Sequence, residues 1–112
     1  LSGLDGGGGA KKDPKKSLSS KEKSNVDVIA SDTGVYSGKI VDFYKEGEKE
    51  GDIIRACVIS GRSGNDIYTI MKLKNESGWN KVYSTYNITG TIKGEVDSKV
   101  TAISKKINPE KK

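Results

Sequence analysis

The first 25 residues contain too few apolar side chains to build a folded core. Leu1, Leu4, Ala10 and Leu18 are the only apolar residues among them, and Gly, Ser and Lys dominate the rest. Such a segment cannot bury enough surface to offset the entropy lost on ordering. We therefore expect residues 1–25 to form a disordered Gly/Ser/Lys-rich tether with a root-mean-square span of about 25–30 Å.

The remaining residues suffice for one small domain, which we place at 26–104, followed by a basic C-terminal tail at 105–112. The net charge of +5 resides in the two ends, because residues 1–25 and 105–112 carry +3 each while 26–104 carries −1. A protein that grips a phosphate backbone should concentrate cations on its folded surface. This distribution disfavours nucleic acid as the partner, although a clustered basic face within a neutral total stays open.

The chain contains no His and a single cysteine, Cys57. It therefore lacks the commonest general base and metal ligand, and it can form neither an internal disulfide nor a cysteine-based zinc site. We expect a protein that is not an enzyme and that holds no cofactor or metal. The sequence also has no apolar run long enough to span a bilayer.

The opening Leu1-Ser2-Gly3 resembles the end of a bacterial lipoprotein signal, in which the next residue is the Cys that receives the lipid. Leu4 stands at that position, so membrane attachment by a lipid anchor requires that the natural residue be Cys. A polar tether leading to a folded domain is also common in such lipoproteins. The resemblance implies an extracytoplasmic location, in the cell envelope or at the surface of a bacterium.

From Val26 onward Ile and Val greatly outnumber Leu, which favours strands, because β-branched side chains suit a pleated surface. The run at 52–60 is nearly all apolar and is typical of a buried central strand. Gly38 inside another apolar segment indicates a bulge or bend. The predicted strands are 26–30, 34–44, 52–60, 66–74, 88–94 and 95–104, the last two joined around Lys93-Gly94.

The segment at 79–86 is ambiguous. Trp79, Val82, Tyr83 and Tyr86 have the spacing of one helical face, whereas the Tyr, Val and Thr content suits a strand. We favour a short helix or an irregular turn that leads into a strand.

The segments "YSGKIVDF" and "ITGTIKGEV" resemble the first and fourth strands of an OB-fold, a five-stranded partly open barrel. The similarity in strand order spans residues 34–104. It implies an all-β domain of five or six strands with at most one short helix. A β-sandwich or a different small barrel remains open.

Aromatic residues are the first candidates for a binding site, since they can stack on bases, sugars or a protein partner. In a small domain with one Phe, most of them should instead serve the core. The candidate binding residues are Trp79, Tyr83, Tyr86, Tyr68 and Arg62.

Three further features have a functional and a structural interpretation. The segment "SGRSGND" at 60–66 has glycines and Arg62 that could hold an anion, but it lacks the rest of a phosphate loop and favours a tight turn. Cys57 fits a buried hydrophobe better than a reactive thiol. Four alternating acidic residues could offer oxygens to calcium but favour a solvated, repulsive turn: Glu46, Glu48, Glu50 and Asp52.

These features predict a non-enzymatic, lipoprotein-like binding module, presented outside the cytoplasm on a flexible tether, that contacts a protein or cell-surface component. Two alternatives stay open: an OB-type protein that binds single-stranded nucleic acid, and a structural subunit of a surface or secretion assembly that joins its neighbours through a strand edge. The sequence does not indicate the oligomeric state.

Overall fold

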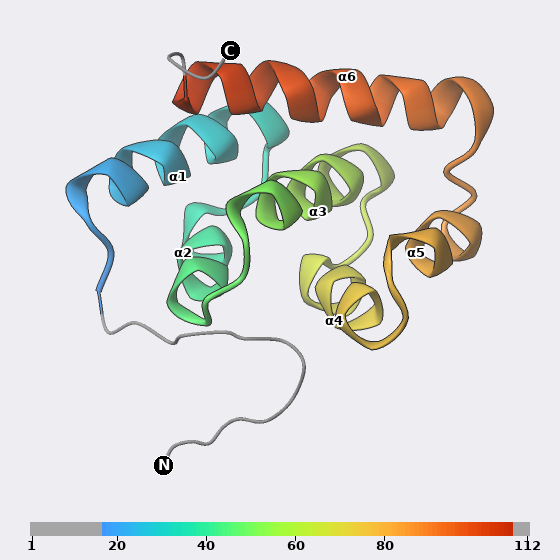
Figure 1. Ribbon diagram of the computed structural model, residues 1–112, viewed down its shortest axis with the longest axis horizontal. Coiled ribbons are helices and arrows are strands. Elements are labelled where there is room, and N and C mark those ends of the chain that lie inside the picture. The colour runs from blue at the N-terminus through green and yellow to red at the C-terminus, as the bar shows by residue number, and fades with distance from the viewer. Residues whose placement is uncertain (1–16, 109–112) are drawn as a thin grey trace.

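The computed structural model describes residues 17–108, and every regular element in that range is a helix (Figure 1). The helix α3 lies at the centre, in contact with α1, α2, α4 and α6, while α6 lies along one side of the molecule over α1 and α3. The helices are α1 (Ser20–Thr33), α2 (Ser37–Lys45), α3 (Glu50–Ser63), α4 (Ile67–Ser77), α5 (Trp79–Thr85) and α6 (Gly90–Ile107).

The buried side chains recur at helical spacing. In α6, Val96, Val100, Ile103 and Ile107 are the buried residues, and they fall on one face of the helix. Within α2 and α4 the buried positions follow an i, i+3, i+4 pattern: Ile40, Phe43 and Tyr44, then Ile67, Ile70 and Met71. Each helix therefore places an apolar stripe toward the shared core, which stabilises the helix through burial more than through its intrinsic propensity.

Glycines end two of the helices, α1 and α3. Gly34 after α1 and Gly64 after α3 have φ values of 79° and 78°, the left-handed conformation in which a side chain is strained. Their amides donate to the carbonyls of Ala30 and Ser60, so the last turn of each helix is closed. The chain then reverses direction at each glycine and enters the next helix.

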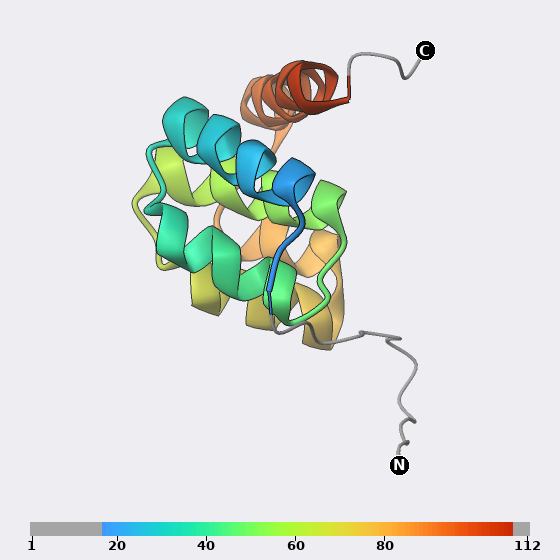
Figure 2. The same ribbon diagram turned by 90° about the vertical axis from the view of Figure 1, so that its left-hand side faces the viewer.

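The two helical hairpins, α1–α2 and α3–α4, repeat each other with a shift of 30 residues, from Gly34 to Gly64. In the first, the Thr33 hydroxyl donates to the Ile29 carbonyl at 2.7 Å and accepts from the Val35 amide at 3.3 Å. In the second, the hydroxyl of Ser63 makes the equivalent bonds to the residues shifted by 30, at 2.7 and 3.2 Å. The two turns therefore share one local structure. Figure 2 shows them on the same side of the molecule.

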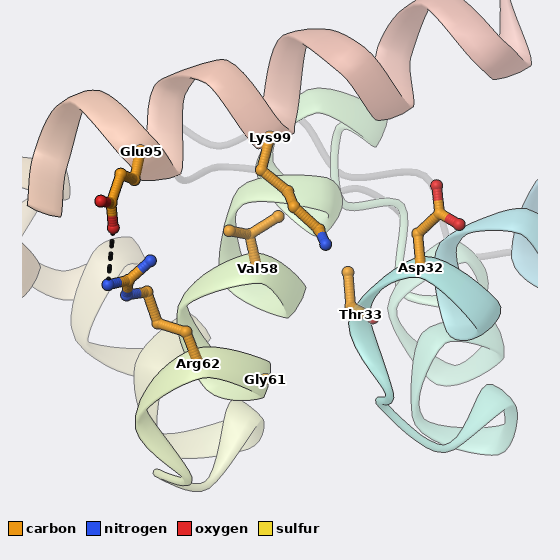
Figure 3. A pocket seen from close by; sticks show the side chains of 7 residues that line it. All are labelled: Asp32, Thr33, Val58, Gly61, Arg62, Glu95 and Lys99. Atoms are coloured by element: carbon orange, nitrogen blue, oxygen red, sulfur yellow. Dashed lines mark ion pairs between the residues drawn. The ribbon is translucent and has the colours of Figure 1, made fainter.

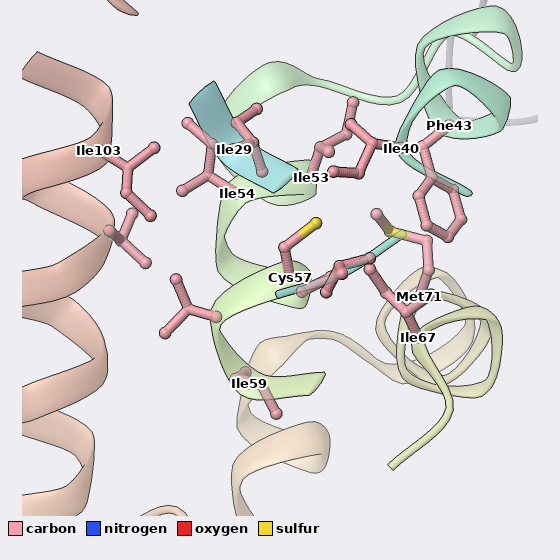
Figure 4. Close-up of a cluster of buried hydrophobic side chains, with 14 of the residues drawn as sticks. Ile29, Ile40, Phe43, Ile53, Ile54, Cys57, Ile59, Ile67, Met71 and Ile103 are labelled. Atoms are coloured by element: carbon pink, nitrogen blue, oxygen red, sulfur yellow. The ribbon is translucent and has the colours of Figure 1, made fainter. Parts of the chain in front are cut away.

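Isoleucine is the commonest residue of the core, which is centred on α3 and receives isoleucines from five of the six helices. Figure 4 shows Cys57 of α3 among Ile29, Ile40, Ile53 and Ile67. Cys57 is fully buried, which confirms its interpretation as a small hydrophobe.

The predicted all-β fold is wrong, and with it the resemblance to an OB-fold barrel. The segment at 26–30 lies in α1, 34–44 covers a turn and most of α2, 52–60 lies in α3, and 66–74 covers the cap and most of α4. The last two predicted strands, 88–94 and 95–104, belong to the turn before α6 and to α6 itself, so no hairpin forms at Lys93-Gly94. Only the helical interpretation of the segment at 79–86 is confirmed, as α5.

The reason is that burial in the core offsets the lower helix propensity of β-branched residues, so they are found in helices as well as in strands. A short buried apolar run, such as 52–60, has no periodicity that separates a buried strand from a buried helix.

The folded region begins inside the segment predicted as a tether. Ser19 caps α1 through a capping box with Glu22, in which each side chain bonds the backbone of the other residue at 3.0–3.1 Å. Leu18, counted among the tether residues, is buried in the core. At the other end, α6 continues to Ile107, inside the predicted basic tail. The rest of both predicted ends, residues 1–16 and 109–112, lies outside the described residues.

Candidate binding groove

A groove lies where the two hairpin turns meet α6. One part is a cavity of about 380 Å³ between the end of α1, α3 and α6, lined by Asp32, Thr33, Val58, Gly61, Arg62, Glu95 and Lys99 (Figure 3). The other part, of about 600 Å³, lies between the two turns and is lined by Thr33, Gly34, Val35, Tyr36, Lys39, Ser60, Gly61, Gly64, Asn65, Asp66 and Ile67. Thr33 and Gly61 line both parts, so we treat them as one surface, the turn groove.

The floor of the turn groove is formed by backbone and by small or apolar side chains. Gly61 faces the carbonyl of Thr33 so closely that a β carbon on Gly61 would overlap it. Val35, Val58 and Ile67 line the groove as well and are themselves buried. The floor is therefore shallow, with accessible backbone.

Charged side chains stand along the part of the groove beside α6. Arg62 is paired with Glu95 at 2.8 Å, as Figure 3 shows, and Asp32 is paired with Lys106 at 2.7 Å. Lys99 extends from α6 toward Thr33 (Figure 3) and forms no hydrogen bond or ion pair within residues 17–108. In the part of the groove beside α6, Arg62 is thus paired, and Lys99 has no carboxylate partner among the described residues.

Tyr36 stands at the rim between the two turns. It is 73% exposed, the most exposed of the large hydrophobic side chains described. Its ring lies against Gly38, where an added β carbon would come within 2.6 Å of the ring. The ring therefore occupies the space that a side chain at position 38 would fill.

The predicted binding residues fall into three places. Trp79 and Tyr83 of α5 are stacked, with ring centroids 6.2 Å apart, and together with Tyr86 they are partly buried against the core. Arg62 lines the turn groove. Tyr68 lies on α4, 39% exposed, with its ring 5.4 Å from that of Phe43. The structure brings the α5 residues together but leaves Arg62 and Tyr68 apart from them.

The α5 aromatic residues are held by a polar network. The Trp79 indole donates to Asp52 at 3.0 Å, and Arg55 donates to the Tyr83 hydroxyl at 2.9 Å and to Asp97 at 2.6 Å. Hydrogen bonds from Arg55 and then Lys93 lower the pKa of Asp97. This network ties α5 to α3 and α6. With Phe43 and Tyr44 buried as well, the expectation that most aromatic residues serve the core is confirmed.

Tyr68 contacts charged groups on both sides. Its hydroxyl donates to Asp42 at 2.7 Å, and this hydrogen bond raises the pKa of Tyr68 to about 12. The ammonium of Lys39 lies 5.8 Å from the centre of its ring. Tyr68 therefore positions Lys39, which lines the turn groove.

Three of the four acidic residues at 46–52 are engaged with other helices, against the solvated, repulsive turn that the sequence predicts, whereas Glu46 is exposed. Glu50 accepts from Tyr44 at 2.6 Å, from Asn25 at 2.8 Å and from Asn108 at 3.1 Å. Asn75 donates to Glu48, and Lys74 pairs with Asp52. These carboxylates join helices, and the residues that the structure describes contain no cluster suited to a metal ion.

The segment at 60–66 forms the end of α3 and the turn into α4, in agreement with its interpretation as a turn. Asp66 caps α4 by accepting from the Thr69 amide and hydroxyl, both at 2.9 Å, and these bonds lower the pKa of Asp66. The helix end that could have held an anion is therefore occupied by the chain itself.

No family model, curated protein or solved structure matches the chain. Across residues 17–108 no helix combines the length and apolar character that crossing a bilayer requires.

Sequence reasoning missed Lys39 and Lys99 as candidate site residues, and it considered Tyr36 with the other aromatic residues but did not select it. A signal was present for Tyr36, which stands between Gly34 and Gly38 in "GVYSG", a composition typical of a turn. The assignment of that segment to a strand interior hid the signal. Nothing in the local sequence indicates that Lys99 approaches the turns, because this depends on the packing of α6 over α1 and α3.

Proposed function

We propose that this chain is a non-enzymatic protein-binding module whose contact surface is the turn groove. The observation that carries the proposal is the exposed Tyr36 ring, seated on Gly38 beside a shallow groove. Tyrosine is enriched at the centres of protein interfaces because one rigid ring supplies apolar area and a hydroxyl.

The chemistry of the chain supports binding over catalysis. The sequence has no His, and the single thiol, on Cys57, is buried with its pKa raised to about 12 by burial. The carboxylates of the turn groove are engaged in pairs or in a helix cap. The all-helical fold removes the barrel face on which an OB-type nucleic-acid site depended.

Site-specific photo-crosslinking in the source organism tests the proposal. A photoreactive phenylalanine analogue replaces Tyr36 in one variant and Lys81, an exposed residue of α5 outside the groove, in the control. We expect position 36 to give a discrete crosslinked protein that position 81 does not give. The same products from both positions, or none from position 36, would contradict the proposal.

The proposal also places the module outside the cytoplasm of a bacterium, on a polar tether. Support for this comes only from Leu1-Ser2-Gly3 and the composition of the segment that follows. Protease treatment of intact cells that express the gene from its natural start tests the location. We expect digestion of the protein while a cytoplasmic marker survives, and protection of both would contradict the placement.

A further inference from the structure

We propose that the turn groove takes an acidic peptide segment of the partner, with carboxylates of that segment paired to Lys39 and Lys99. This inference rests on the proposed function and names the chemistry of the partner. It follows from one difference: the anionic side chains that line the groove are already engaged, whereas two of the cationic ones form no ion pair within residues 17–108.

The acidic side chains of the groove already have partners. Asp32 is paired with Lys106, Glu95 with Arg62, and Asp66 caps α4. The Glu95 pair also neutralises Arg62. An approaching cationic segment would meet carboxylates that are already engaged, so it would gain less from them than from isolated carboxylates.

The two groove lysines lack such partners. Neither Lys39 nor Lys99 forms an ion pair with a carboxylate of residues 17–108. Lys39 lies over the ring of Tyr68, and after the hydrogen bonds from Thr69 its charge also lowers the pKa of Asp66, with which it forms no ion pair. Lys99 extends from α6 into the other part of the groove (Figure 3). Within residues 17–108, each part of the groove thus holds one lysine that forms no ion pair: Lys99 in the first, and in the second Lys39, which interacts with Asp66 only at longer range.

The shape of the floor favours an extended chain over a helix. Gly61 brings the floor down to the level of the backbone, and the buried Val35 and Val58 give it an apolar character. An extended peptide can lay small or apolar side chains on such a floor and direct carboxylates outward to flanking lysines. Tyr36 at the rim then covers part of the bound segment.

A peptide fits these charges better than a nucleic acid does. The backbone of a nucleic acid carries a phosphate at every nucleotide, and its affinity grows with each phosphate neutralised. In the turn groove, Asp32, Glu95 and Asp66 would meet that continuous negative charge. A peptide places its carboxylates at separate positions and can leave these three undisturbed.

The test is an NMR titration of the ¹⁵N-labelled full chain with three short synthetic peptides. One alternates Glu with Ala, and the others replace every Glu with Gln or with Lys. For the Glu peptide we expect amide shifts confined to residues 33–39, 60–67 and 95–99. We expect about fivefold weaker binding of the Gln peptide, since exposed ion pairs contribute modestly, and no binding of the Lys peptide.

Matched variants separate the two lysines from the overall charge. The double variant Lys39→Gln/Lys99→Gln should lose about the same fivefold for the Glu peptide, and Lys39→Arg/Lys99→Arg should keep the affinity. Lys81→Gln/Lys105→Gln removes the same charge at exposed positions outside the groove and should bind like the unmodified chain. An unchanged amide spectrum away from the substitutions shows that each variant is folded.

Four outcomes overturn the inference. The first is equal loss in the two Gln double variants, and the second is shifts concentrated at the lysines near the end of α6. The third is tighter binding of a single-stranded oligonucleotide than of the Glu peptide at the same groove. The fourth is equal binding of the Gln and Glu peptides in the groove, which would leave the proposed function standing. Failure of every peptide to bind would also overturn the inference. The same failure together with no crosslink at position 36 would overturn both the inference and the proposed function.

Discussion

Gly61 of α3 packs directly against the backbone carbonyl of Thr33 at the end of α1, with no space for a side-chain carbon between them. The contact brings the first hairpin turn onto the central helix. It also forms the place where the two parts of the turn groove join, since both residues line each part. The position of α1 on α3 and the floor of the groove therefore depend on the same glycine.

Gly61→Ala should lower the free energy of unfolding by about 1–3 kcal/mol, because the new methyl group forces α1 away from α3. Gly94→Ala is the matched control, since Gly94 lies inside α6 with open space around its would-be β carbon. This control should raise stability by about 0.5–1 kcal/mol. Urea denaturation measures both changes, and stabilisation by Gly61→Ala would show that the close approach is absent.

Tyr44→Phe should destabilise the chain by about 1.5–3 kcal/mol, because the 4% exposed Tyr44 donates a hydrogen bond to the Glu50 carboxylate. Burial and then this bond raise the pKa of the Tyr44 hydroxyl, so it stays protonated and able to donate. Tyr36→Phe is the comparison and should change stability by less than about 0.5 kcal/mol, since Tyr36 is exposed. Equal effects in thermal unfolding would contradict the Glu50 contact.

Asp97→Asn should make the chain less stable at neutral pH and remove part of its acid sensitivity. The pKa of Asp97 is lowered in the folded state by Arg55 and Lys93, so the ionised carboxylate stabilises the fold. This contribution is complete above the unfolded-state pKa of about 3.9 and disappears as the pH falls through the lower folded-state pKa. Urea midpoints of both proteins should differ at pH 6 and converge near pH 2, whereas a constant difference would contradict this role.

The Cys57 thiol should react with a disulfide reagent only when the core opens. Burial raises its pKa to about 12, and the side chain is fully buried in α3. We expect labelling to be slow in buffer and to reach the rate of a free thiol in denaturing urea. Fast labelling of the folded chain would show that α3 is not enclosed by the surrounding helices.

Part of this structure could be predicted from the sequence. The apolar run at 52–60 indicates the central, buried element of the fold. Cys57 within that run is buried, as expected. The helical spacing of Trp79, Val82 and Tyr83 correctly indicates α5. These predictions succeed because buried segments are recognisable by their apolar composition and by the spacing of their apolar residues.

The secondary structure of the other segments was misjudged for two physical reasons. Residues with high β propensity lie in helices here, because burying an Ile or Val side chain in the core is favourable in a helix as well as in a strand. Gly34 and Gly64, taken as the limits of strands and turns, are C-caps of helices. The buried positions Val96, Val100, Ile103 and Ile107 carried the helical period in the sequence, but the assignment of 95–104 to a strand and of Ile107 to the tail concealed it.

The turn groove was beyond sequence reasoning because it combines residues from α1, α2, α3 and α6. The chosen aromatic cluster on α5 lies mainly against the core, while Tyr36 is the exposed ring. The exposure of Tyr36 depends on how the turn before α2 packs against the rest of the molecule. Local composition does not determine this for a turn between two short helices.

Binding through Tyr36 is tested most directly by calorimetry with the partner that the position-36 crosslink identifies. Tyr36→Ala should weaken the affinity by about 30-fold or more, the loss of about 2 kcal/mol expected for an anchoring tyrosine. Lys81→Ala, on the exposed side of α5, should bind within about twofold of the unmodified chain. Equal affinities of the Tyr36→Ala and Lys81→Ala variants would contradict a binding role for the turn groove.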